Sequence, residues 1–174
     1  MKINNNFIPF IIFFSGLSAS GKTTISRKFL KKIKSKGISR IINIDGDDFR
    51  KKKNSFIFKK TDRNTVGDKK IALAKRYFKK GFIVVVSGIA ADSKWRKRIK
   101  KNNKDFFEIY VKCPLKICEK RDFKKQYKMA REGKIKNFVG IDLKYEIGQS
   151  HDLTLNSSRL TITKSVSKVI NFLK

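Results

Sequence analysis

The sequence predicts a three-layer α/β fold, in which one parallel sheet lies between helices on both faces. Three observations predict it. Short continuous apolar runs, of the kind that parallel sheets bury on both faces, recur along the chain. They alternate with segments whose apolar residues are three and four positions apart. The 174 residues, 40% of them hydrophobic, suffice for a single domain over residues 1–174 and are too few to suggest two.

The predicted strands are recognised by their apolar runs. Residues 10–14 form the first, residues 40–44 (RIINI) the second, and residues 82–88 (FIVVVSG) the clearest. Residues 105–111 (DFFEIYV) and a short segment at 152–155 follow. The N-terminal lysine and apolar run superficially resemble a signal peptide. That run is short for one and leads straight into a glycine-rich loop, so a buried first strand explains it better.

The predicted helices are recognised by apolar residues that repeat with helical spacing. The first follows the glycine-rich loop and ends at Gly37, the second lies near residues 68–80 and stops at Gly81, and a short one covers residues 115–121. The last carries a stripe formed by Val166, Val169, Ile170 and Leu173. Because helices connect successive strands, right-handed crossovers and a parallel sheet are expected.

The charge balance is extreme, since 44 Lys and Arg against 14 Asp and Glu give a formal net charge of +30. Such a charge attracts anions. The basic residues are scattered through nearly every segment, which favours a solvated surface that helps to collect phosphorylated substrates, with nucleic-acid binding as the alternative. No run approaches the roughly 20 apolar residues of a membrane span, so no membrane partner and a cytoplasmic location are expected.

The two cysteines, Cys113 and Cys118, lie five positions apart. With one histidine in the whole chain, they cannot complete a four-ligand zinc site. They are therefore expected to be reduced thiols that pack like small apolar groups.

The glycine-rich loop reads GLSASGKT and fits the phosphate-loop pattern G-x-x-x-x-G-K-[ST] between a strand and a helix, as the pattern requires. Its glycines let backbone N–H groups turn toward phosphates, Lys22 is expected to reach the β- and γ-phosphates, and the Thr23 hydroxyl is expected to bind Mg²⁺. The loop thus predicts a P-loop NTPase-type sheet and a nucleoside triphosphate, by default ATP. The residues expected to bind it are Gly16, Ser18, Ala19, Ser20, Gly21, Lys22, Thr23 and Thr24.

Acidic residues follow the second strand in the sequence Asp45-Gly46-Asp47. Their carboxylates are expected at the carboxyl edge of the sheet, beside the phosphate loop, where α/β folds bind ligands. There one carboxylate can orient Mg²⁺ and another can accept the proton of an attacking hydroxyl. The candidate catalytic residues are thus Lys22, Asp47 and Asp45, and the candidate metal residues are Thr23 and Asp47. An ordinary β-to-α turn is the alternative explanation of the acidic pair.

Five stretches stand together in register: GLSASGKT, IDGDDFR at 44–50, CPLKICEKRD at 113–122, YKMAREG at 127–133 and KNFVGIDLKYE at 136–146. Together they resemble the adenylylsulfate kinase family over roughly residues 10–155, and the last stretch is far more specific than a phosphate loop. The resemblance implies transfer of the γ-phosphate of ATP to the ribose 3′-hydroxyl of adenylylsulfate. The products are ADP and 3′-phosphoadenylylsulfate, the activated donor of sulfate assimilation.

The resemblance also implies an acceptor pocket for this small nucleotide, in which two arginines hold the phosphosulfate, two phenylalanines sandwich the base and further residues line the wall. The residues implied are Arg50, Phe58, Arg63, Ile89, Lys136, Asn137 and Phe138. It further implies a mobile lid over ATP at about residues 121–135, which includes Arg121. This stretch is rich in Lys and Arg, and such side chains can neutralise phosphoryl charge as a lid closes.

The chain departs from the family pattern around the acceptor. Asp48 and Val66 each stand where the family has Asn, and Ala90-Ala91 replaces a Ser-Pro. Because the loss of a polar contact changes specificity, a kinase of another modified nucleotide, such as cytidine diphosphoramidate in surface-polysaccharide synthesis, is an alternative. A basic nucleic-acid-binding protein or polynucleotide kinase is a third. No specific nucleic-acid partner is expected, since the aromatic residues mostly occupy apolar strand and helix positions; a homodimer is left open.

Overall fold

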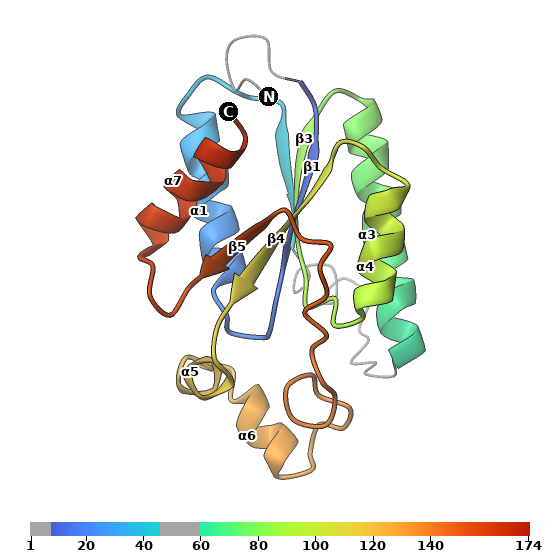
Figure 1. Ribbon diagram of the computed structural model, residues 1–174, viewed down its shortest axis with the longest axis vertical. Coiled ribbons are helices and arrows are strands. Elements are labelled where there is room, and N and C mark those ends of the chain that lie inside the picture. The colour runs from blue at the N-terminus through green and yellow to red at the C-terminus, as the bar shows by residue number, and fades with distance from the viewer. Residues whose placement is uncertain (1–7, 46–59) are drawn as a thin grey trace.

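The computed structural model describes residues 8–45 and 60–174. Over these residues the strands form one sheet in the order β2-β3-β1-β4-β5, and every neighbouring pair is parallel (Figure 1). The strands are β1 (Ile11–Ser15), β2 (Ile41–Ile44), β3 (Ile83–Ser87), β4 (Phe106–Lys112) and β5 (Leu153–Asn156). The predicted parallel sheet is confirmed. The first and last residues of each strand lie within one residue of their predicted positions.

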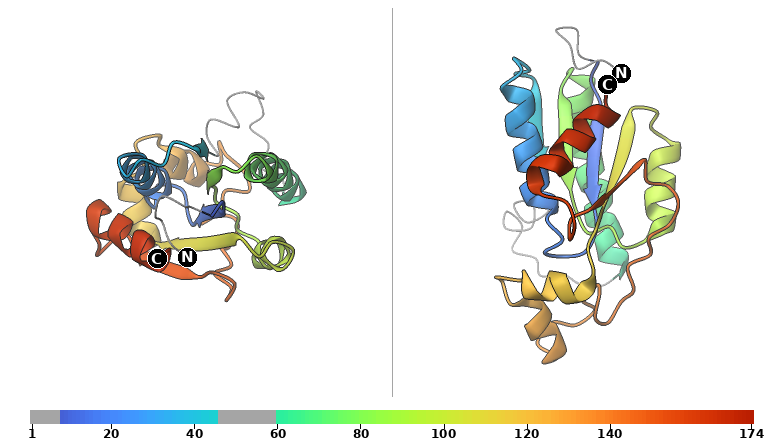
Figure 2. Two further views of the ribbon diagram at one scale, coloured as in Figure 1. Left: turned by 90° about the horizontal axis from the view of Figure 1, so that it is seen from above. Right: turned by 60° about the vertical axis from the view of Figure 1, so that its left-hand side comes forward.

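Helices cover both faces of the sheet (Figures 1 and 2). One face carries α1 (Lys22–Lys34) and α7 (Ile162–Phe172), and the other carries α3 (Lys60–Lys79) and α4 (Ser93–Lys101). Two short helices, α5 (Leu115–Lys120) and α6 (Gln126–Arg131), lie beyond the carboxyl ends of the strands, below the sheet in Figure 1. The predicted three-layer arrangement with a P-loop NTPase-type sheet is therefore confirmed.

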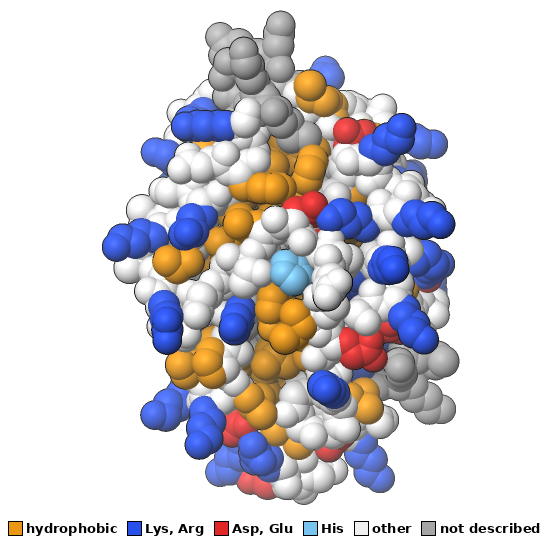
Figure 3. Space-filling model, viewed as in Figure 1, with side chains coloured by type: hydrophobic (Ala, Val, Ile, Leu, Met, Phe, Trp, Pro, Cys, Tyr) orange, Lys and Arg blue, Asp and Glu red, His pale blue; other side chains and the backbone are white. Residues whose placement is uncertain are grey.

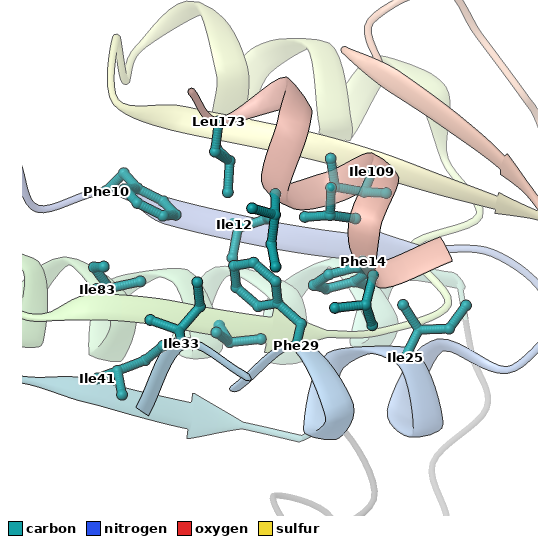
Figure 4. Packing of buried hydrophobic residues seen from close by; sticks show 14 of the residues in the cluster. Phe10, Ile12, Phe14, Ile25, Phe29, Ile33, Ile41, Ile83, Ile109 and Leu173 are labelled. Atoms are coloured by element: carbon teal, nitrogen blue, oxygen red, sulfur yellow. The ribbon is translucent and has the colours of Figure 1, made fainter. Parts of the chain in front are cut away.

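The central strand β1 is buried on both faces. Ile12 and Phe14 belong to the apolar layer under α1 and α7, where Phe29 lies beside them (Figure 4). Ile11 and Phe13 belong to the opposite layer, under α3 and α4. Burial from both sides explains why the sequence shows a continuous apolar run here. The loop that follows β1 is therefore anchored to the middle of a rigid core.

Helix α3 differs from the sequence prediction, because it begins at Lys60 rather than near residue 68 and continues through Gly67. A glycine inside a helix normally weakens it. Here a Cβ at Gly67 would lie 2.6 Å from the indole of Trp95, so the missing side chain lets α4 approach α3 closely. The indole Nε1 of Trp95 also donates a hydrogen bond of 2.9 Å to Asp68 Oδ1.

Helix α4 is not predicted by the sequence analysis. Trp95 and Ile99 are its apolar residues, and the rest of SKWRKRIKK apart from its serine is Lys or Arg, so helical spacing gives a weak signal. Asp92 caps the start of this helix, since its side chain accepts a hydrogen bond of 3.1 Å from Trp95 N. Arg96 is buried with the two apolar residues, although its charge identifies it in the sequence as a surface residue.

Lys and Arg side chains spread over the whole face seen in Figure 3 and do not gather in one patch. On this face, the distribution agrees with the solvated basic surface that the sequence predicts. Within residues 8–45 and 60–174, no helix combines the length and the apolar character that crossing a bilayer requires.

Candidate active site

The phosphate loop connects β1 to α1 and follows an unusual backbone path. Gly16, Ala19 and Gly21 have φ values of 141°, 54° and 97°, in the left-handed region. Such conformations gather successive backbone N–H groups into a concave site for anions. At Gly16 a Cβ would lie 2.6 Å from the carbonyl oxygen of Val111 on β4, so glycine is required at this position for close packing as well as for its φ.

Lys22 is the first residue of α1, and its side chain folds back over the loop. It is only 8% exposed, its Nζ donates to the carbonyl oxygen of Leu17, and Nζ lies 3.4 Å from Ser20 Oγ. The ammonium group is therefore held at the loop, where a phosphate chain would bind. Thr23 is half-buried at the start of the same helix, and Thr24 is exposed.

Asp45 lies at the carboxyl end of β2, at the same edge of the sheet as the phosphate loop. Its side chain is 3% exposed, and its Oδ2 lies 3.9 Å from Arg27 Nη2 on α1. Three other predicted site residues, Asp47, Arg50 and Phe58, lie outside the described residues, as does Asp48. Their predicted roles stay predictions.

The oxygen donors at this edge fit a Mg²⁺ ion. The Thr23 hydroxyl is a hard ligand of the type that Mg²⁺ prefers, and the Asp45 carboxylate adds a second oxygen group of that type at this edge, whereas Asp47, the predicted carboxylate ligand, lies outside the described residues. Within the described part of the chain, no group of three or more His, Cys, Asp or Glu forms a protein cage for a metal. In phosphoryl-transfer sites Mg²⁺ is usually bound by one or two protein ligands together with substrate phosphates and water.

The segment after β3 lies against the phosphate loop. Gly16 N donates a hydrogen bond of 3.4 Å to the carbonyl oxygen of Ile89, so this predicted acceptor residue adjoins the ATP side of the site. Ser87, the last residue of β3, donates from Oγ to Ser26 Oγ on α1 at 3.1 Å. Sequence reasoning missed the buried Lys70 of α3, whose Nζ lies 3.4 Å from Ser87 O. Lys70 lies one helical turn before Ala74, on the apolar stripe of that helix. This position is the feature of the sequence that could have identified it as buried.

Arg63 and Asn137 meet although they are 74 positions apart in the sequence. Arg63, near the start of α3, donates from Nη2 to the carbonyl oxygen of Asn137. Lys136 and Asn137 are exposed, whereas Phe138 is 2% exposed and packs edge-on against Tyr127 with 4.9 Å between ring centroids. Contact between Phe138 and a nucleotide base stays a prediction, and in this structure the ring already packs within the protein.

The predicted lid contacts the phosphate loop directly. On α6, the Tyr127 hydroxyl donates to Ser18 O at 3.0 Å, and Gln126 Oε1 accepts from Ser18 Oγ at 3.2 Å. Burial raises the pKa of Tyr127, which favours the protonated hydroxyl that donates this hydrogen bond. Sequence reasoning missed both α6 residues, because nothing in the local pattern links them to a loop more than 100 positions away.

Arg121, predicted to bind ATP, reaches the phosphate loop through an intermediary. Its Nη2 donates to Ser157 O at 3.1 Å, and Ser157 Oγ donates to Ser20 O at 2.7 Å. A second guanidinium nitrogen lies 3.7 Å from Cys113 Sγ. Ser157 was also missed by sequence reasoning. The lid is thus hydrogen-bonded to the loop directly at Ser18 and connected to it through Ser157 at Ser20.

Both cysteines are free and buried, as expected from the sequence. Cys118 is fully buried behind the lid with Tyr127 and Phe138, and burial raises the pKa of its thiol to about 12. The thiolate is the reactive form of cysteine, and at pH 8 an ordinary thiol with a pKa of about 8.5 is partly ionised. Cys118 is therefore chemically protected in the folded protein.

We expect iodoacetamide at pH 8 to alkylate Cys118 at least ~100-fold more slowly in the native protein than in urea, because burial both covers the thiol and keeps it protonated. Peptide mass spectrometry over time measures this rate. Similar rates in the native and unfolded protein would show that the cluster around Cys118 opens readily.

The site combines a phosphate loop on the central strand with a lysine folded over it. Carboxylate and hydroxyl oxygens lie at the same sheet edge. This combination is suited to the transfer of a phosphoryl group. The fold and the site thus define the class of the protein, which is a P-loop phosphotransferase.

The chain belongs to the adenylylsulfate kinase family, whose model, described as Adenylylsulphate kinase, matches residues 8–156. An adenylyl-sulfate kinase of Clostridium acetobutylicum is 36% identical over 166 residues, which cover 94% of this chain and 82% of the relative. That of Halothermothrix orenii is 37% identical, with 94% and 88% covered. Among solved structures, Mycobacterium tuberculosis APS kinase in complex with AMPPNP and APS is similar, with a TM-score of 0.87, 32% identity, and 95% and 97% of the two chains covered.

Proposed function

We propose that the enzyme transfers the γ-phosphate of ATP to the ribose 3′-hydroxyl of adenylylsulfate, giving ADP and 3′-phosphoadenylylsulfate. One observation carries the proposal: the contact between Arg63 and Asn137 joins the two segments implied for the acceptor at the sheet edge that holds the phosphate loop. The similarity to the Mycobacterium tuberculosis APS kinase, whose structure contains AMPPNP and APS, supports the same conclusion. A cytoplasmic location and a homodimer remain predictions.

On the donor side, the loop backbone and Lys22 bind the phosphates of ATP. The Lys22 ammonium, held at the loop by Leu17 O, neutralises charge on the oxygens of the transferring group. Thr23 and Asp47 would hold Mg²⁺, which would offset the negative charge of the phosphates during transfer. Tyr127 and Arg121 connect the lid to Ser18 and, through Ser157, to Ser20, so closure of the lid would exclude water from the phosphates.

On the acceptor side, Arg63 holds the phosphosulfate and the segment at Lys136–Phe138 surrounds the nucleoside. The 3′-oxygen attacks the γ-phosphorus, the bond to the β-phosphate oxygen breaks, and the hydroxyl proton passes to a carboxylate. Asp47 is the proposed acceptor of that proton. Asp45 lies two residues before it and contributes negative charge at the same edge, where Arg27 accompanies it at 3.9 Å.

An acceptor screen with labelled ATP tests the proposal. We expect wild-type enzyme to phosphorylate adenylylsulfate in preference to cytidine diphosphoramidate, AMP or an oligonucleotide. Arg63→Ala should raise the KM for adenylylsulfate by at least ~10-fold and the KM for AMP by less, because it removes a charge-assisted contact to the sulfate-bearing group.

Arg98→Ala is the matched control for Arg63→Ala, because Arg98 is 56% exposed on α4 and pairs with Asp68 on the protein surface. It should leave both KM values unchanged. Preferential phosphorylation of cytidine diphosphoramidate or of the oligonucleotide would replace adenylylsulfate as the proposed acceptor. Equal effects of Arg63→Ala on adenylylsulfate and AMP would remove this arginine from recognition of the sulfate.

A further inference from the structure

A buried ion pair lies between α4 and β4, behind the site described above. Arg96 Nε and Glu108 Oε1 are 2.8 Å apart, and each side chain is 1% exposed. Neither residue belongs to the phosphate loop, the lid or the implied acceptor pocket. Burying two charges is costly unless their remaining hydrogen-bonding groups are also satisfied. The partners of this pair therefore indicate what it does.

The guanidinium of Arg96 joins two segments, each of which adjoins residues implied for the acceptor in the sequence. Nη1 donates to the carbonyl oxygen of Ala90, in the segment that follows β3. Nη2 donates to the carbonyl oxygens of Glu146 and Ile147, in the segment that follows the KNFVGID stretch. The guanidinium also lies over the ring of Tyr145, 5.1 Å from its centroid. A single planar side chain thus holds both segments at fixed positions.

The same two segments are also joined directly. Glu146 N donates to Ala91 O at 3.0 Å. The Glu146 carboxylate accepts from Ser93 N at 3.0 Å and from Ser93 Oγ at 2.6 Å, at the start of α4. These hydrogen bonds attach the segment around residue 146 to the helix that carries Arg96. Helix α4 therefore holds the segment through the side chains of Ser93 and Arg96.

Glu108 extends the network to the phosphate loop. Its Oε1 accepts from Ser15 Oγ at 2.7 Å, and its Oε2 accepts from Ser150 Oγ at 3.0 Å. Ser15 is the last residue of β1 and immediately precedes Gly16, whose N–H donates to the carbonyl oxygen of Ile89. The ion pair therefore connects the base of the phosphate loop with the segment at 89–91 and the segment at 145–147.

We propose that Arg96 and Glu108 are positioning residues, which set the acceptor side of the site relative to the phosphate loop. The inference rests on the proposed function for what the acceptor side binds. In-line phosphoryl transfer requires the attacking oxygen to approach the phosphorus at near-contact distance, and misplacement by about 1 Å can cost on the order of 100-fold in rate. Arg96 acts by holding backbone carbonyl groups and does not touch substrate.

The test compares binding of the two substrates in Arg96→Lys. Lysine keeps a positive charge near Glu108 but lacks the planar fork that reaches three carbonyl groups. We expect the KM for the acceptor to rise ~10-fold and kcat to fall, while the Kd of an ATP analogue measured without acceptor changes less than ~2-fold. Arg98→Lys, on the same helix but in an exposed pair with Asp68, is the control and should change neither value.

Glu146→Gln is a second, milder variant that decides the question if Arg96→Lys does not fold. It keeps the backbone contacts of the segment and weakens the hydrogen bonds from Ser93, so we expect a ~3-fold rise in acceptor KM without a change in the Kd of the ATP analogue. A purely structural role predicts a lower melting temperature and less active enzyme with unchanged KM and Kd. That result in the folded variants, or an equal loss of ATP-analogue affinity, would overturn the proposal.

All variants are assayed with the acceptor that wild-type enzyme uses best in the screen described above. If wild-type enzyme does not phosphorylate adenylylsulfate, the proposed function fails. The positioning role is then still measured with the preferred acceptor. If wild-type enzyme uses adenylylsulfate and Arg96→Lys leaves its KM unchanged, only the positioning role fails.

Discussion

Replacing Lys22 with alanine should lower kcat by on the order of 100- to 1,000-fold. The ammonium group is held at the phosphate loop by Leu17 O and Ser20 Oγ, and no other phosphate-loop residue carries a positive charge. Loss of a preorganised group that stabilises charge in the transition state has costs of this size. Because Leu17 and Ser20 both belong to the loop, the loss of these two contacts should leave the fold intact, with a far-ultraviolet circular dichroism spectrum like that of wild type.

Steady-state kinetics with saturating ATP and acceptor measure the effect. Lys28→Ala is the control, since Lys28 is exposed on the same helix and should leave kcat unchanged. A folded Lys22→Ala enzyme with near-normal turnover would exclude this phosphate loop from the chemistry.

Gly16→Ala should abolish binding of ATP and lower the free energy of unfolding by about 2–5 kcal/mol. Two costs combine at this position. A φ of 141° is strained for any residue with a Cβ, and the added methyl group would lie 2.6 Å from Val111 O, a backbone atom of the central sheet. Either the loop or β4 must move. Both adjustments displace the backbone N–H groups that cradle the phosphates.

Gly37→Ala separates the two costs. Gly37 also has a positive φ, 85°, but a Cβ there would meet no atom within 4 Å. It should therefore lose only about 1 kcal/mol and keep full affinity for an ATP analogue. Urea unfolding and isothermal titration calorimetry measure the two quantities. If Gly16→Ala behaves like Gly37→Ala in both, the close approach to Val111 is not what fixes the loop.

Local sequence determined the sheet, most of its helices and the phosphate loop. The continuous apolar run of residues 10–14 predicts a central strand because burial on both faces leaves no polar alternation. The glycines of GLSASGKT predict a loop whose backbone N–H groups turn toward phosphates, and in the structure Gly16 and Gly21 have the positive φ values that such a path uses. These features depend on residues within one turn or one strand of each other, so a pattern in the sequence is enough to identify them.

Tertiary structure decided which residues touch one another at the site, and before it only the family resemblance had placed Arg63 and Asn137 in one pocket. The contacts of Arg63 with Asn137 and of Tyr127 with Ser18 span 74 and 109 positions, and no periodicity in the sequence relates such residues. The burial of Arg96 with Glu108 could not be predicted from the sequence either, because a charged residue in a basic helix normally faces water. Such groups become buried only when the packed segments supply the carbonyl groups and counter-charge that replace water, and this supply exists only in the folded chain.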